Sequence, residues 1–274
     1  MITFPNCKIN LGLNIVARRT DSYHDILTLF YPVNLTDILE IVPAQNGETT
    51  LNITGNAVDC PMEQNLVIRA YRLLQTEFNL PPVEIHLHKH IPDGAGLGGG
   101  SSDAAATLRI LNEMFNLGLN EEQLATRAAT LGADCPFFIY NRPMLASGIG
   151  DILTPAKLSL CGHTIVLAKP DINISTREAY AAITPAMPEH TPEQITAWPI
   201  QQWDGHLTND FENSVFPLHP TLWQLKLNLL GAGAQYAAMS GSGSTIYGIF
   251  ENDKLAQDAA LTLTSCRTFV IPMT

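Results

Sequence analysis

The segment Pro92-Asp-Gly-Ala-Gly-Leu-Gly-Gly-Gly-Ser-Ser-Asp103 carries five glycines between positions 94 and 100. Glycine has no side chain to block a ligand and it tolerates positive φ, so successive backbone N–H groups can point toward one anion. Residues 104–115 have the apolar spacing of a helix, which Ser101 and Ser102 are expected to cap. A helix N-terminus adds partial positive charge. The segment therefore predicts a phosphate-binding loop, not a flexible linker.

Two other glycine-rich motifs resemble this segment in part. Gly94, Gly96 and Gly99 have the spacing of the dinucleotide-binding fingerprint, which needs a preceding strand buried on both faces. Residues 83–88 instead alternate apolar and polar side chains, which indicates one buried and one exposed face. The dinucleotide reading is therefore the less favoured alternative. A P-loop is excluded because no Gly-Lys-Ser/Thr follows the glycines.

Composition sets the class of protein. The 274 residues, 46% of them hydrophobic, suffice for one large domain or two moderate ones. The balance of 15 basic and 26 acidic side chains, a net charge of −11, argues against a nucleic-acid partner. Five scattered cysteines without a CxxC pair indicate reduced thiols. With no signal peptide and no run of 18 apolar residues, we expect a cytoplasmic protein without a membrane partner.

Alternation and helical spacing along the chain predict the α+β class, with a soft boundary near residue 155. The predicted helices cover residues 65–78, 102–116 and 121–131, the last closed by Gly132 as a C-terminal cap. The predicted strands cover residues 7–15, 26–31, 38–42, 49–53, 83–88 and 165–168, and two short strands flank 239–245. On the first strand, Lys8, Asn10 and Asn14 share the polar face.

Three histidines at alternate positions before the loop resemble a set of metal ligands. His86, His88 and His90 alternate along the strand that precedes the glycines. They have no carboxylate partner at ligand spacing and lie on its exposed face, so we expect surface residues and no metal ligand.

Five motifs occur in order and span nearly the whole chain: Lys8 to Leu11, Asp21-Ser-Tyr-His24, Pro92 to Ala105, residues 132–138 and Met239 to Thr245. Together they resemble the superfamily of galactokinase, homoserine kinase, mevalonate kinase and phosphomevalonate kinase, the GHMP kinases. The likeness is greatest to the members that act on cytidylated methylerythritol.

The resemblance implies a two-lobed fold. Residues 1–155 would form an ATP-binding lobe like domain 2 of ribosomal protein S5, and residues 156–274 a ferredoxin-like α+β lobe that completes the substrate site. It also implies an enzyme that uses ATP and Mg²⁺ to phosphorylate the 2-hydroxyl of cytidylated methylerythritol in the non-mevalonate synthesis of isoprenoid precursors. A homoserine- or mevalonate-type kinase, or a non-catalytic ligand-binding relative, remains the alternative.

Two residues are expected to carry the chemistry. From its own surroundings, Asp134 is typical of a carboxylate that caps or solvates a turn, and Lys8 could be either solvated or functional. The resemblance implies that Asp134 takes the proton of the acceptor hydroxyl. A lysine beside it would keep the carboxylate ionised and lower the pKa of the hydroxyl.

The resemblance also assigns binding residues. The donor phosphates would contact Pro92, Gly94, Ala95, Gly96, Leu97, Gly98, Gly99, Gly100, Ser101 and Ser102, and the adenine side would be formed by Asn65, Leu66 and Lys89. The acceptor would contact Asn10, Tyr23, His24, Phe30, Thr176, Tyr180, Gly241, Ser242 and Gly243. Ser22 stands where a glycine is usual, and Asp93 places a carboxylate beside the loop.

Overall fold

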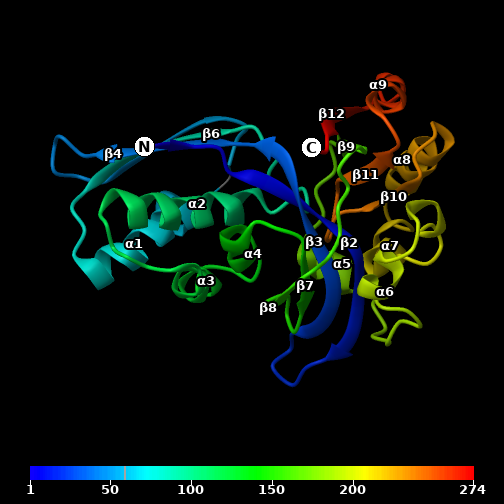
Figure 1. Ribbon diagram of the computed structural model, residues 1–274, viewed down its shortest axis with the longest axis horizontal. Coiled ribbons are helices and arrows are strands. Elements are labelled where there is room, and N and C mark those ends of the chain that lie inside the picture. The colour runs from blue at the N-terminus through cyan, green and yellow to red at the C-terminus, as the bar shows by residue number, and fades with distance from the viewer. Residues whose placement is uncertain (59) are drawn as a thin grey trace. The chain divides into compact units, whose positions relative to one another are not determined.

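The computed structural model describes residues 1–58 and 60–274, which form two compact units (Figure 1). The first unit contains residues 1–7, 35–93 and 98–142, and the second contains residues 8–34, 94–97 and 143–274. The units interleave along the chain because residues 8–34 belong to the second unit, where the strand 6–18 pairs with the strand 24–36 and the latter pairs with residues 144–146. They do not coincide with the expected segments 1–155 and 156–274, and that division as functional lobes stays a prediction.

The first unit is a four-stranded sheet covered by helices. Its strand order is β1-β4-β6-β5, antiparallel except for the parallel pair of β5 and β6. Figure 1 shows α1 and α2 lying along one face of this sheet. The elements are β1 (Ile2–Thr3), β4 (Ile38–Pro43), β5 (Thr50–Gly55), the short 3-10 helix Met62–Gln64, α1 (Leu66–Phe78), β6 (Val83–Lys89), α2 (Gly99–Met114), α3 (Glu121–Ala129) and α4 (Cys135–Tyr140).

The strand that leads to the glycine loop explains this arrangement. Along β6, Val83, Ile85 and Leu87 are buried under the helices, whereas His86 and His88 are exposed. A two-residue period of this kind belongs to a sheet with one covered face. Because β6 also pairs antiparallel with β4, the dinucleotide-binding alternative is not supported. The same period places Lys89, the last residue of β6, on the buried face.

The second unit contains two four-stranded sheets, in the orders β2-β3-β7-β8 and β10-β11-β9-β12. Helices α8 and α9 cover the second of these, as Figure 1 shows. The strands are β2 (Asn6–Arg18), β3 (His24–Thr36), β7 (Met144–Ser147), β8 (Ile152–Pro155), β9 (Thr164–Pro170), β10 (Tyr236–Met239), β11 (Ile246–Phe250) and β12 (Cys266–Pro272). The helices are α5 (Thr176–Tyr180), α6 (Pro192–Thr196), the 3-10 helix Ile200–Gln202, α7 (Asp210–Val215), α8 (Pro220–Gly231) and α9 (Asp253–Thr262).

One hydrophobic cluster ties the second unit together. It joins residues of β2, β9, α7, α8 and β11, among them Ile15, Val166, Phe211, Leu222 and Phe250. Burial of side chains of this size is the main source of stability in such a core. The expected α+β class is confirmed. Within the described residues, no helix is both long enough and apolar enough to cross a membrane.

Two predicted helix ends are wrong. Helix α2 begins at Gly99 with Gly98 as its N-cap, so Ser101 and Ser102 lie inside the helix and do not cap it. Gly98 takes a φ of 71°, which glycine adopts at little cost and serine does not. Helix α3 ends at Ala129 with Thr130 as its C-cap, and Gly132 lies beyond it.

Candidate active site

Within the second unit, residues 94–97 of the glycine loop are held between β2 and the turn that joins β10 to β11. The backbone N–H of Lys8 donates to the carbonyl of Leu97 at 2.9 Å. On the other side, the Ser240 hydroxyl donates to the carbonyl of Gly96, also at 2.9 Å. Three of the five sequence motifs therefore meet inside this unit.

Gly96 shows why the loop needs glycine. It has a φ of 75°, and a Cβ placed there would lie 2.0 Å from the carbonyl oxygen of Ser240. Such a contact would force the two backbones apart, because the clashing atom belongs to the main chain and not to a flexible side chain. Any substitution at Gly96 would therefore separate the loop from the β10–β11 turn.

The first turn of α2 has open space at Gly100. A Cβ at Gly100 would meet only Leu66 Cδ1, at an ordinary 3.8 Å, so packing does not require a glycine there. The first amide with an intrahelical partner is that of Ser102, which donates to Gly98 at 3.0 Å. The first-turn N–H groups ahead of it are orphans of the helix, and such groups bind anions. The amides of residues 99–101 therefore remain candidates for binding phosphate, whereas Ser102 is 3% exposed and its amide is already bonded.

The polar face of β2 forms a buried network in the second unit. Lys8 Nζ donates to Asn10 Oδ1 at 2.6 Å, and it lies 5.0 Å from the centre of the Phe30 ring. Asn10 Nδ2 donates in turn to Thr28 Oγ1 at 3.0 Å. Lys8 and Asn10 are only 4% and 2% exposed. The predicted residues Lys8, Asn10 and Phe30 are therefore brought together.

Asp134 lies at the N-cap position of α4, in the first unit. Its side chain makes no capping hydrogen bond there, which weakens the interpretation that it only caps a turn. The next residue, Cys135, is buried, and burial raises the pKa of its thiol to about 11. That thiol stays protonated and is no rival nucleophile. Because Lys8 belongs to the second unit, the predicted approach of Lys8 and Asp134 stays a prediction.

Four of the nine expected acceptor residues, Tyr23, His24, Thr176 and Tyr180, line one cavity of about 270 Å³ in the second unit, and the other five are not in its lining. The rings of His24 and Tyr180 stack there with centroids 4.7 Å apart. Tyr23, in contrast, is 61% exposed. The full lining is Ser22, Tyr23, His24, Ile149, Thr176, Arg177 and Tyr180. Sequence reasoning missed Ile149 and Arg177, although Arg177 stands between two predicted residues.

The backbone conformation at Ser22 explains why glycine is usual at this position of the motif. It has a φ of 72°, in the left-handed region that side chains other than those of Asn and Asp rarely adopt. The backbone N–H of Ser22 closes the turn by donating to the carbonyl of Arg19 at 3.3 Å. The N–H of Tyr23 donates to Asp21 Oδ1, which lowers the pKa of that carboxyl. The departure from glycine therefore stores strain beside the acceptor cavity.

Gly241, Ser242 and Gly243 form the turn between β10 and β11, as predicted for the glycine–serine segment. Asn209 Nδ2 donates to the carbonyls of Met239 and Gly241, at 2.7 and 2.8 Å. Sequence reasoning missed Asn209, because it is distant in the chain and belongs to no recognised motif.

Of the adenine-side residues, Asn65 and Leu66 lie at the beginning of α1. Asn65 Oδ1 accepts the N–H of Val67 at 2.9 Å and so caps that helix. Lys89 is 4% exposed and forms ion pairs with Asp37 and Asp103. Asp37 lies between β3 and β4, and no sequence signal singled it out.

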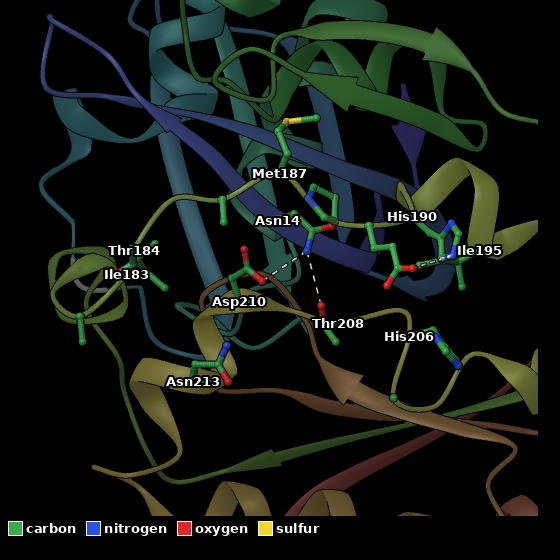
Figure 2. A pocket seen from close by; sticks show the side chains of 15 residues that line it. Asn14, Ile183, Thr184, Met187, His190, Ile195, His206, Thr208, Asp210 and Asn213 are labelled. Carbon is green, nitrogen blue, oxygen red and sulfur yellow. Dashed lines mark hydrogen bonds and ion pairs between the residues drawn. The ribbon is translucent and has the colours of Figure 1, made fainter.

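A larger cavity, of about 540 Å³, opens next to β2 in the second unit (Figure 2). Asn14 Nδ2 contacts Thr208 Oγ1 at 3.4 Å and Asp210 Oδ1 at 3.3 Å. Asp210 Oδ2 accepts the N–H of Ile15, and burial raises the pKa of the carboxyl. The sequence indicated only Asn14, since the other lining residues come from loops and short helices far along the chain.

Among residues 1–58 and 60–274, no group of three His, Cys, Asp or Glu side chains is placed to hold a metal ion. His86, His88 and His90 are all exposed.

A glycine loop that leads into the N-terminus of a helix is consistent with the class of the GHMP kinases. Residues 65–142 match the family model for the N-terminal domain of GHMP kinases, and residues 200–266 match the model for the C-terminal domain.

Similarity to individual proteins identifies the family within the GHMP kinases. A 4-diphosphocytidyl-2-C-methyl-D-erythritol kinase of Bacteroides thetaiotaomicron is 54% identical over 253 residues, 92% of each chain. One of Porphyromonas gingivalis is 47% identical over 264 residues, 96% of each chain. A crystal structure of 4-(cytidine 5'-diphospho)-2C-methyl-D-erythritol kinase superposes with a TM-score of 0.86 at 33% identity, and covers 99% of this chain and 98% of that one. The chain belongs to the 4-diphosphocytidyl-2-C-methyl-D-erythritol kinase family of the GHMP kinases. The predicted resemblance and fold are confirmed.

Proposed function

We propose that this kinase transfers the γ-phosphoryl group of ATP to the 2-hydroxyl of 4-diphosphocytidyl-2-C-methyl-D-erythritol, in the cytoplasm, for the synthesis of isoprenoid precursors. The bond between the hydroxyl oxygen and the γ-phosphorus forms, the bond from that phosphorus to the β-phosphate oxygen breaks, and ADP leaves. The observation that supports the donor side is the open space at Gly100 in the first turn of α2, where packing does not require a glycine.

Asp134 accepts the proton of the acceptor hydroxyl in this proposal. A positioned base typically contributes about 10²–10⁴-fold to the rate. Lys8 stabilises the negative charge that develops on the transferred group, and Asn10 and Phe30 hold its ammonium in place. Positioning of the two substrates supplies the rest of the acceleration.

The acceptor's cytosine binds in the cavity lined by His24 and Tyr180. Their stacked rings provide an aromatic face, and the imidazole and Thr176 provide polar edges for the base. Recognition of a base commonly joins stacking to hydrogen bonds of this kind. Arg177 of the same cavity adds positive charge that suits the diphosphate.

Mg²⁺ enters this proposal as a partner of ATP that offsets phosphate charge. It prefers oxygen ligands and keeps several waters, so phosphate oxygens would hold most of it. Ser101, half-buried in the first turn of α2, fits as a protein ligand. Asp103 does not fit, because it is 2% exposed and its carboxylate pairs with Lys89.

A coupled assay of ADP release, run with cytidylated methylerythritol, homoserine and mevalonate side by side, tests the proposal. We expect sustained turnover with the cytidylated alcohol alone. Turnover with one of the other alcohols would favour a different member of the superfamily. ATP binding without turnover on any of the three would favour a non-catalytic relative.

A further inference from the structure

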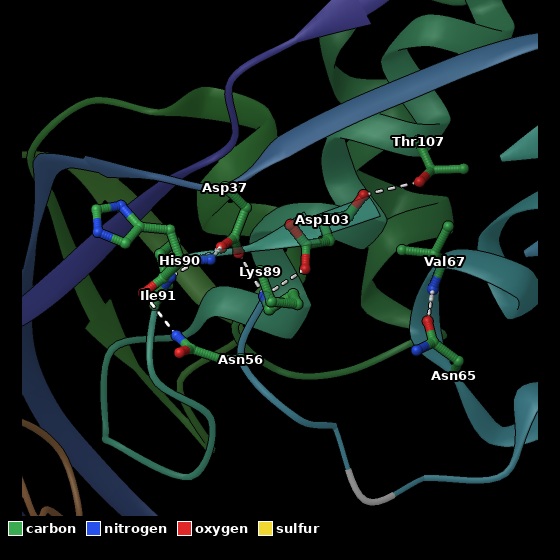
Figure 3. A network of polar contacts seen from close by, with 9 residues as sticks. All are labelled: Asp37, Asn56, Asn65, Val67, Lys89, His90, Ile91, Asp103 and Thr107. Carbon is green, nitrogen blue, oxygen red and sulfur yellow. Dashed lines mark hydrogen bonds and ion pairs between the residues drawn. The ribbon is translucent and has the colours of Figure 1, made fainter. Parts of the chain in front are cut away.

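The strongest feature that the proposed function leaves unused is a cluster of three charged side chains in the first unit. Lys89 Nζ donates to Asp103 Oδ2 at 2.7 Å and also to Asp37 Oδ2 (Figure 3). All three residues are at most 4% exposed. Two carboxylates thus share one ammonium group in a place that water barely reaches.

Burying two carboxylates with a single ammonium group is unfavourable in free energy. Removing charged groups from water is unfavourable, and one ammonium cannot offset two carboxylates. Asp103 Oδ1 is buried and has no hydrogen-bond partner among the described residues. Burial and the neighbouring Asp37, only partly countered by Lys89, raise the pKa of Asp103 to about 7. Because this cluster does not maximise the stability of the fold, we look for a functional reason for its three charged residues.

The contacts of the cluster point to the two ends of the glycine loop. Asp37 Oδ1 accepts the backbone N–H groups of His90 and Ile91, at 2.6 and 2.8 Å, just before the loop begins. Asp103 lies in α2, one turn after the loop ends. Lys89 links the two carboxylates.

Gly99 shows how tightly these parts pack. A Cβ at Gly99 would lie 3.0 Å from Ile91 Cγ2 and 3.3 Å from Lys89 Nζ. The first residue of α2 therefore lies directly against the lysine and against the entry to the loop. Asn56, the residue after β5, also holds this segment, because its side-chain amide donates to the carbonyl of His90 at 2.8 Å.

We propose that Lys89, Asp37 and Asp103 act as positioning residues, which clamp the entry of the glycine loop to the first turn of α2. The clamp preorganises the amides that receive the donor phosphates and thereby lowers the entropic cost of binding ATP. This inference rests on the proposed function and deepens it. It assigns Lys89 a role through the loop, whereas the resemblance implied direct contact with the nucleotide.

Asp103 offers the sharpest test, since two mechanisms predict opposite results. If the carboxylate acts only through its charge, its removal beside a polyphosphate site tightens ATP binding. If it clamps the helix, Asp103→Ala weakens ATP binding, by about tenfold for the loss of one hydrogen bond to a charged group. Asp103→Asn keeps an acceptor for Lys89 at the same place and is expected to restore the wild-type affinity.

The measurements are ATP binding by calorimetry, steady-state kinetics, and hydrogen exchange of residues 98–104 in the ligand-free protein. For Asp103→Ala we expect faster exchange in this segment and a higher KM for ATP, with kcat and the KM for the acceptor alcohol nearly unchanged. Arg127→Met is the matched control, because it removes the exposed ion pair with Glu77 in the same unit. It should leave the exchange and the ATP affinity as in the wild type.

Unchanged or tighter ATP binding by Asp103→Ala, with unchanged exchange of residues 98–104, would overturn the clamp. The exchange and calorimetry need no acceptor alcohol, so they decide this inference even if the protein failed to phosphorylate the cytidylated substrate. If Asp103→Ala does not fold, Lys89→Arg provides the second test. It keeps the charge but changes the geometry, and it should raise exchange in the same segment.

Discussion

Two buried lysines of this chain hold their ammonium groups in different chemical settings. Lys8, on β2, contacts the neutral amide of Asn10 and the face of Phe30. Lys89, at the end of β6, contacts the carboxylates of Asp37 and Asp103. The two settings differ in chemistry: an amide oxygen and an aromatic face orient the ammonium of Lys8, and two carboxylates bind that of Lys89. We assign Lys8 to the chemistry and Lys89 to the position of the loop, and the predictions below test that difference.

The largest expected effect concerns the partner proposed for Lys8. Asp134→Asn should lower kcat by about 10²–10⁴-fold, because the amide cannot accept the proton of the hydroxyl. The affinity for ATP should stay near that of the wild type, and calorimetry with ATP is the control. Normal turnover by this variant would remove Asp134 from the chemistry.

Replacing Lys8 should have the next largest effect. Lys8→Met keeps the length of the side chain and removes the charge, so we expect kcat to fall by about 10²–10³-fold. Steady-state kinetics with both substrates varied would measure it. A rise in the KM for ATP with no change in kcat would break the comparison, since that is the signature expected of the Lys89 clamp.

The third prediction tests the cost of the Lys89 cluster through pH. The folded-state pKa of Asp103, about 7, lies above the ordinary value of 3.8, so folding favours the protonated form of this carboxyl. The ionisation of Asp103 therefore lowers the free energy of unfolding as the pH rises from about 4 to about 7. Above a pH of about 7 this reduction stays constant. Asp103→Asn should show a gain in the free energy of unfolding that grows over this interval, to at least about 2 kcal/mol at pH 8.

Urea unfolding of the wild type and Asp103→Asn at pH 4, 5, 6, 7 and 8 measures this gain. A difference that does not depend on pH would show that Asp103 is ionised throughout, as an ordinary ion pair with Lys89 would be.

The smallest effect concerns backbone strain in the unit that holds Lys8. Ser22→Gly relieves a residue with a φ of 72° and should raise the free energy of unfolding by about 0.5 kcal/mol, after the cost of a more flexible unfolded chain. Asn79→Gly is the control, because asparagine adopts its φ of 53° more easily. Equal effects of the two substitutions would contradict the assignment of strain to Ser22.

Local patterns predicted much of this molecule. Alternation along residues 83–88 indicated a strand with one buried face, and β6 has that face. The ends of α2 were predicted less well, because serine is a common helix cap and only the left-handed φ of Gly98 shows that the glycine takes this place. Alternation placed Lys8 and Asn10 on one face of a strand, the resemblance added Phe30, and the three residues meet within one unit.

The residues that the sequence did not predict share one property, which is that their contacts lie far away along the chain. Asp37 contacts residues 52 to 54 positions away, and Asn209 supports a turn 30 positions further on. Neither belongs to a motif, and a single aspartate or asparagine between two elements carries no signal by itself.

The sequence by itself determined the kinase family to which this protein is similar and predicted a phosphate-binding loop, because glycine content, alternation and motif order can be read directly along the chain. Only the tertiary structure decided which partner each charged side chain has. Whether a lysine meets an amide or two carboxylates depends on strands and helices that the fold brings together, and the free energy of a buried charge is set by those neighbours.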